Sequence, residues 1–140
     1  DEVTRDTSYI GNVCITTCGA PASTSNATIQ LFDEWRGDAV GSPMRPQMNK
    51  DFAIAYDKMI CLKDGYYHIY AHTLRNITAA HCTIRINDTY DPAVSHGTDT
   101  SHDTITTNVM LFLKRGDFVQ CKGGWYASNT ASYFQIWKGD

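Results

Sequence analysis

Residues 58–72 read KMICLKDGYYHIYAH, and this stretch decides the predicted fold. Two apolar runs flank the dipeptide Asp64-Gly65, which is typical of a hairpin turn between antiparallel strands. Successive side chains of a strand point to opposite faces of its sheet. We therefore expect the second run to direct one set of side chains into a sandwich core. This set is Tyr67, Ile69, Ala71 and Thr73.

The opposite face of the same run is aromatic and partly polar. It carries Tyr66, His68, Tyr70 and His72. Such a face is too aromatic for an ordinary solvent-facing surface and is typical of a contact between subunits. The alternative is that the tyrosines lie under a loop of the same subunit.

Short strand-like runs continue on both sides of this stretch. We expect strands at residues 9–16, 28–32, 52–56, 58–62, 66–74, 82–86, 109–113, 118–121 and 133–137. Residues 23–28, 40–49 and most of 94–107 are expected to be loops, and residues 115–117 a second tight turn. No window has a helical period. The pattern predicts an all-β chain, folded as an antiparallel two-sheet sandwich or jelly roll. Residues 1–8 are expected to form a flexible lead-in, and residues 9–140 a single domain.

Composition excludes several classes of function. The 140 residues carry a formal net charge of −3 and contain no basic cluster, so nucleic acid is not expected as a partner. The sequence has no apolar run long enough to span a bilayer, and no signal peptide is expected in it.

Cysteines and glycosylation signals favour an extracellular protein. The five cysteines form no CxxC pair and have no zinc-finger spacing. Sequons for N-linked glycosylation stand at Asn26, Asn76 and Asn87. Extracellular proteins combine disulfides with such sequons. The alternative is a reduced chain in which the cysteines are buried as small apolar side chains.

The sequence contains no motif for catalysis. It lacks a phosphate-binding loop, a nucleophile elbow and a metalloprotease helix, so no catalytic residue, cofactor or metal is predicted. His96, Asp99, His102 and Asp103 lie close together in sequence, and we expect them to be solvated loop residues. The integrin-type tripeptide RGD occurs at residues 36–38 and 115–117, where the second copy is explained by its turn.

Three segments in order resemble one known family. They are residues 58–72, residues 109–119 (VMLFLKRGDFV) and residues 132–138 (SYFQIWK). Together they resemble the ligands of the tumour necrosis factor (TNF) superfamily, and the complement globular-head family is the close alternative. Two departures stand out: Gln135 replaces a usual Gly, and Thr107-Asn108 replaces a Gly pair. The N-terminal half matches only loosely.

The resemblance implies a function as well as a fold. It implies a TNF-like jelly roll that forms a homotrimer and binds a cysteine-rich receptor of the TNF-receptor family in the grooves between subunits. An enzyme or a sugar-binding lectin on a jelly roll is the alternative from another class. The trimer interface would include His68, Tyr70, His72 and Tyr133.

The resemblance also places the receptor contacts on loops. Tyr90, in the loop after the strand at residues 82–86, would be an exposed aromatic anchor with Asp88 and Asp91 beside it. Trp35 and Arg36 form a second candidate loop. The alternative for Tyr90 is a half-buried loop residue, and a glycan on Asn87 would crowd this site.

The jelly roll of the family also implies a disulfide pairing. The strand that carries Cys82 would lie antiparallel beside the strand that carries Cys121, so these two cysteines are the preferred pair. Cys61 would then pair with Cys14 or Cys18, leaving one thiol over. The protein would be secreted, or would be the ectodomain of a single-pass type II membrane protein.

Overall fold

The computed structural model describes residues 13–16, 25–31, 34–35, 51–74, 80–97, 103–125 and 132–138. These residues contain ten strands. They are β1 (Val13–Thr16), β2 (Glu34–Trp35), β3 (Phe52–Ala55), β4 (Lys58–Cys61), β5 (Gly65–Leu74), β6 (His81–Ile86), β7 (Tyr90–His96), β8 (Thr104–Leu113), β9 (Phe118–Gly123) and β10 (Tyr133–Lys138). The predicted lead-in at residues 1–8 and the predicted loop at 40–49 lie outside the described residues.

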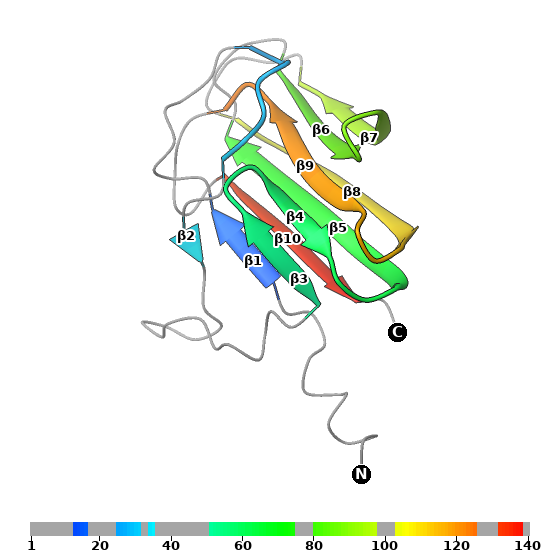
Figure 1. The fold of residues 1–140 in the computed structure, drawn as a ribbon. Coiled ribbons are helices and arrows are strands. Elements are labelled where there is room, and N and C mark those ends of the chain that lie inside the picture. The colour runs from blue at the N-terminus through cyan, green and yellow to red at the C-terminus, as the bar shows by residue number, and fades with distance from the viewer. Residues whose placement is uncertain are drawn as a thin grey trace.

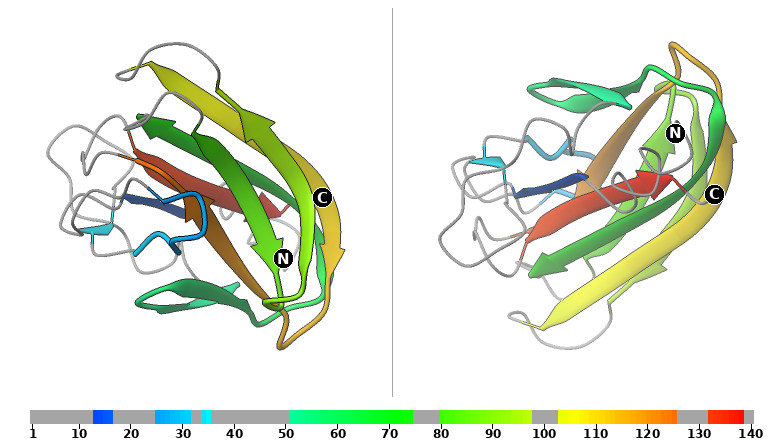
Figure 2. Two further views of the ribbon diagram at one scale, coloured as in Figure 1. Left: turned by 90° about the horizontal axis from the view of Figure 1, so that it is seen from above. Right: turned by 90° about the horizontal axis from the view of Figure 1, so that it is seen from below.

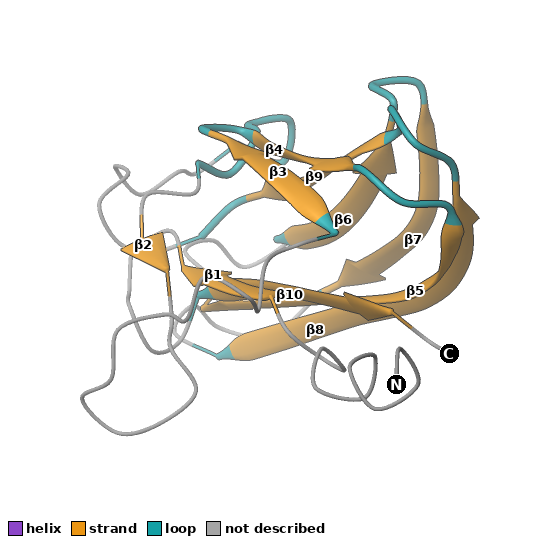
Figure 3. Ribbon diagram, turned by 60° about the horizontal axis from the view of Figure 1, so that its bottom comes forward, coloured by secondary structure: helices purple, strands orange, loops and turns teal. Residues whose placement is uncertain are grey.

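The strands form two antiparallel sheets that pack face to face (Figures 1 and 3). The first sheet has the order β2-β1-β10-β5-β8, and the second has the order β3-β4-β9-β6-β7. Sequence neighbours such as β4 and β5 therefore belong to different sheets. The predicted all-β, two-sheet jelly-roll sandwich is confirmed.

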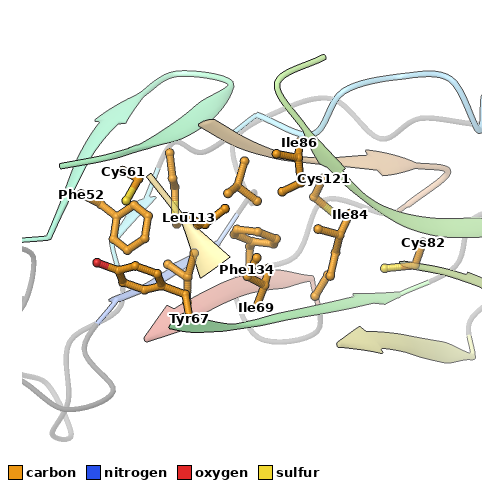
Figure 4. Close-up of a cluster of buried hydrophobic side chains, with 14 residues drawn as sticks. Phe52, Cys61, Tyr67, Ile69, Cys82, Ile84, Ile86, Leu113, Cys121 and Phe134 are labelled. Atoms are coloured by element: carbon orange, nitrogen blue, oxygen red, sulfur yellow. The ribbon is translucent and has the colours of Figure 1, made fainter. Parts of the chain in front are cut away.

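Strand β5 alternates as its sequence predicts. Tyr67, Ile69 and Ala71 are fully buried, and Thr73 is 3% exposed. They face the second sheet, where Ile84 and Val119 are also fully buried. Figure 4 shows labelled side chains of both sheets pointing toward one another between the layers. Because apolar burial is the main favourable term in folding, this layer holds the two sheets together.

The turn at Asp64-Gly65 is not the predicted hairpin. Strand β4 pairs with β3 and β9, whereas β5 pairs with β10 and β8, so this turn carries the chain from one sheet to the other. The tight turn at residues 115–117 is confirmed, with Asp117 N donating to Lys114 O at 2.9 Å, but it also joins different sheets. The local turn chemistry is the same in both cases, and only long-range pairing distinguishes a hairpin from a crossover.

The predicted loop at residues 94–107 was wrong over much of its length. Strand β7 continues to His96, and β8 begins at Thr104. The segment is polar because one face of each strand is solvated, while Ile105 and the buried Thr107 point inward. Threonine and isoleucine favour strands, and this preference outweighs the loop-like polarity.

Strands β7 and β8 are the outermost strands of their sheets and lie against each other along one flank of the sandwich (Figure 2). The Ser95 hydroxyl donates to Thr106 O at 2.7 Å across this junction. Deeper inside, the Thr107 hydroxyl donates to Cys82 O at 2.7 Å. These bonds join the two sheets where they meet.

The predicted strand at residues 28–32 is reduced to one bridge. Ile29 pairs with Lys122, and Gln30 N donates to Cys121 O at 2.7 Å. Residue 32 lies outside the described residues. In the region that is described, no helix has the length and apolarity needed to cross a membrane.

Truncation of the core side of β5 tests this architecture. Ile69 is fully buried, so Ile69→Ala should lower the free energy of unfolding by about 2–5 kcal/mol, since it leaves a cavity. The measurement is urea unfolding followed by circular dichroism at one fixed protein concentration. The matched variant Val94→Ala, at a position 43% exposed on β7, should change stability by only about 0.5 kcal/mol. Equal losses for the two variants would contradict the assigned core.

Candidate functional site

The outer side of the first sheet displays a largely aromatic surface, in which Gln135 and Asn108 flank Tyr70. Strand β5 lies between β10 and β8, and cross-strand pairing aligns the outward side chains of all three. We name this surface the aromatic face. Its members are Tyr66, His68, Tyr70, His72, Met110, Phe112, Tyr133 and Trp137.

Ring contacts organise the aromatic face into pairs. His68 stacks on Trp137 with ring centroids 5.0 Å apart and an interplanar angle of 5°. His72 stacks on Tyr133 at 4.7 Å and 10°. Tyr70 lies 6.1 Å from Tyr133 and 6.4 Å from His72, so its ring adds to the second pair. Each stack follows from register, because His68 is opposite Trp137 and His72 is opposite Tyr133.

The side of this face toward β8 is the most exposed. Tyr66, Met110 and Phe112 are 51%, 47% and 48% exposed, and the Tyr66 and Phe112 rings meet edge-on at 5.2 Å. No carboxylate is found among the outward-facing described residues of β5, β8 and β10. A concentrated aromatic surface without carboxylates has the composition of the core of a protein–protein interface.

The second candidate site is the hairpin that joins β6 to β7. Asn87 and Asp88 both have positive φ, at 55° and 60°, which is the left-handed region that Asn and Asp tolerate best. Tyr90 follows directly and is 58% exposed. Tyr90 is the first residue of β7 and not a loop residue, which corrects the sequence prediction. Because it is well exposed, the half-buried alternative does not apply.

A charged network supports the base of this hairpin. The Arg85 guanidinium contacts the Asp88 carboxylate at 3.2 Å and the Asp91 carboxylate at 2.9 Å, and it also donates to Asp88 O at 2.9 Å. Lys122 lies 3.6 Å from Asp91. The hydrogen bond to Asp88, with that to Asp91, raises the pKa of Arg85 above its ordinary value. Asp88 and Asp91 are therefore held in place beside Tyr90.

Asn87 joins this hairpin to the turn between β8 and β9. Its side-chain amide nitrogen donates to the Asp117 carboxylate at 3.1 Å, and its side-chain amide oxygen accepts from Phe118 N at 2.9 Å. The other Asp117 oxygen accepts from Lys114 N at 2.9 Å. One oxygen of Asp117 is thus used within the turn and the other by Asn87, which supports a structural role for the RGD tripeptide at residues 115–117.

The remaining predicted site residues are placed less fully. Trp35 belongs to the short strand β2 and not to a loop, whereas Arg36 and Asn76 lie outside the described residues. The Asn26 side chain accepts from His81 N at 2.8 Å. In the predicted polar loop, His96 is part of β7 and Asp103 is exposed, while Asp99 and His102 lie outside the described residues.

The cysteines that the structure describes at side-chain level are buried thiols. Strands β6 and β9 are antiparallel neighbours, as the resemblance implied, and Cys82 lies opposite Gly123. The Cys82 and Cys121 thiols share a hydrogen bond, which together with burial raises the pKa of Cys121. No disulfide joins them in this structure, so that pairing stays a prediction.

Cys61 donates to Lys63 O at 3.1 Å, and burial raises its pKa. Cys14 lies in β1, and Cys18 is outside the described residues.

Sequence reasoning missed part of each site. Met110, Phe112 and Trp137 belong to the aromatic face but were not predicted there. The signal was available in principle, because Met110 and Phe112 alternate with Val109, Leu111 and Leu113 in a predicted strand. Arg85 and Lys122 were also missed. The role of Lys122 depends on the pairing of β6 with β9, which are distant in sequence, whereas Arg85 contacts carboxylates of its own hairpin.

Asn87→Ala tests the side-chain hydrogen bonds that join the β6–β7 hairpin to the turn between β8 and β9. The substitution removes two side-chain hydrogen bonds and places alanine at a positive φ, so it should lower the free energy of unfolding by about 2 kcal/mol. Asn87→Gly keeps the backbone conformation accessible and should lower the free energy of unfolding by about 1 kcal/mol. Thermal or urea unfolding provides the measurement.

Thr89→Ala is the matched control, because it removes the glycosylation sequon and leaves the Asn87 side chain in place. Its backbone N–H still donates to Ile86 O. We expect unchanged stability. A loss of stability as large as that of Asn87→Ala would mean that removal of the sequon, and not loss of the Asn87 hydrogen bonds, causes the destabilisation.

Comparisons with known proteins find a similarity in structure but none in sequence. No protein-family profile matches the chain, and no curated protein sequence matches it. Among solved structures, murine APRIL at pH 5.0 is similar, with a TM-score of 0.64 at 12% sequence identity. The alignment covers 92% of this chain and 98% of that chain. The chain therefore has a TNF-like jelly-roll fold, similar to that of a TNF-family ligand.

Proposed function

We propose that this chain is an extracellular, cytokine-type ligand that forms a homotrimer and binds a cysteine-rich receptor of the TNF-receptor family. It would be secreted, or would be the ectodomain of a type II membrane protein, and would act by binding and not by catalysis. The single observation that carries the proposal is the aromatic face on a TNF-like fold. The similarity to murine APRIL supports the fold on which the proposal rests.

The aromatic face supports self-association on physical grounds. Its apolar rings are extensively exposed in the single chain, as Tyr66 and Phe112 illustrate. Burying such a surface against another chain is favourable, and each fully buried aromatic side chain contributes about 1.5–3 kcal/mol. His68, Tyr70 and His72 lie on β5, the middle strand of the face, and Tyr133 lies opposite His72 on β10; these are the residues predicted from the sequence as trimer contacts.

The β6–β7 hairpin supports receptor binding. Tyr90 begins β7 directly after a turn that the Asn87 and Arg85 contacts fix. A rigid, exposed aromatic side chain loses little conformational entropy on binding and is a common anchor of protein interfaces. Asp88 and Asp91 would provide polar contacts around this anchor, and Trp35 and Arg36 remain candidates for a second contact.

Tyr70→Glu tests the proposed trimer. A carboxylate at the centre of the aromatic face would be desolvated without a partner, so the variant should be a monomer while the wild type has three times the mass of one chain. Size-exclusion chromatography with light scattering measures this. Tyr56→Glu, at a position 60% exposed in the β3–β4 turn, is the control and should remain trimeric. A wild-type protein that is monomeric at micromolar concentration would contradict the proposed homotrimer.

Tyr90→Ala tests receptor binding separately from assembly. In a screen of TNF-receptor-family ectodomains by surface plasmon resonance, the variant should bind its receptor about 30-fold more weakly, corresponding to ~2 kcal/mol. Its trimer mass should be unchanged. Tyr56→Ala should bind as the wild type does. An intact trimer that binds no receptor of this family would instead favour recognition of the complement globular-head kind.

A further inference from the structure

Two histidines form a cross-strand pair at the end of the β6–β7 hairpin away from Tyr90. His81 lies directly opposite His96 in the register of the two strands. Their rings are stacked, with centroids 4.1 Å apart and an interplanar angle of 9°. The next pair outward is hydrogen-bonded, with Gly97 N donating to Ala80 O at 2.8 Å. His81 and His96 therefore occupy a non-hydrogen-bonded position, where opposite side chains come closest.

This pair has no part in the sandwich core. His96 is exposed and His81 is half-buried, on strands whose apolar side chains already fill the interior. It also lies on the second sheet, whereas the aromatic face belongs to the first. The pair therefore lies outside both the core and the surface proposed for assembly.

Imidazole chemistry indicates what such a pair can bind. A neutral imidazole has one nitrogen with a free lone pair, and histidine is the commonest protein ligand for transition metals. Rotation about the bond between the Cβ atom and the ring is soft, so two adjacent rings can turn their lone pairs toward one ion. Because the strand pairing already fixes both backbones, binding needs no ordering of a loop. No cluster of three or more potential ligand residues is present among the described residues, so water or a partner would complete the coordination.

We propose that His81 and His96 together bind a divalent transition-metal ion of the class that prefers imidazole, such as Zn²⁺ or Ni²⁺. The ion would bridge β6 to β7, the outermost strand of the second sheet, and would stabilise the folded protein by its own binding free energy. Hard cations such as Mg²⁺ prefer oxygen ligands and should not bind here.

The test is calorimetric titration of the full chain, freed of metal with a chelator, with Zn²⁺ and separately with Mg²⁺. Zn²⁺ should bind with one ion per chain at pH 7.5, and Mg²⁺ should not bind. His96→Asn and His81→Asn should each weaken Zn²⁺ binding at least tenfold while retaining the wild-type circular dichroism spectrum. Nitrogen NMR of the imidazoles should show both residues shifting together on addition of Zn²⁺.

His72→Asn is the control on the other sheet and should leave the affinity for Zn²⁺ unchanged. Loss of binding in His72→Asn but not in His96→Asn would place the ion on the aromatic face and overturn the proposal. The absence of Zn²⁺ binding at millimolar concentration would overturn it as well. The result is independent of the proposed receptor function, since Tyr90→Ala should bind Zn²⁺ as the wild type does.

Discussion

The alternation of side chains along β5 is the constraint on which the rest of the structure depends. One set of residues fills the interior between the sheets, and the other set forms the centre of the aromatic face. A shift of one residue in the pairing of β5 with β10 or β8 would exchange these sets. It would place His68 and His72 in the core and bring Ile69 to the surface. Fold and surface are thus fixed by the same register.

Rigidity at the β6–β7 hairpin has a different origin. No apolar core supports the turn itself, and its geometry comes from polar contacts that link distant segments. Asn87 binds the turn between β8 and β9, while Arg85 gathers two carboxylates on its own side. Each exposed contact is weak by itself, but several together hold one conformation. The surface beside Tyr90 is therefore preorganised without burying the residues that a partner would touch.

The sequence was informative wherever structure is local. The period-two pattern of residues 66–74 predicted both faces of β5, and the Arg115-Gly116-Asp117 turn was correctly predicted because Gly116 takes a φ of 97°. Polarity misled the prediction at residues 94–107, where strands on the flank of a sandwich resemble loops. The assignment of Asp64-Gly65 to a hairpin was wrong, since the difference between a hairpin and a crossover lies in distant pairing. The same limit hid the His81–His96 stack, which forms only once β6 and β7 are aligned.

The junction of β7 with β8 has a consequence for solubility. The outermost strand of a sheet normally exposes unpaired main-chain groups, which can recruit a strand from another molecule and begin aggregation. Here these two strands cover each other, and Ser95 occupies the Thr106 carbonyl that would otherwise accept such a bond. Copies of the chain are thereby discouraged from joining edge to edge along this flank. The flank formed by β7 and β8 therefore differs from an open sheet edge, because its main-chain groups face a neighbouring strand and not solvent.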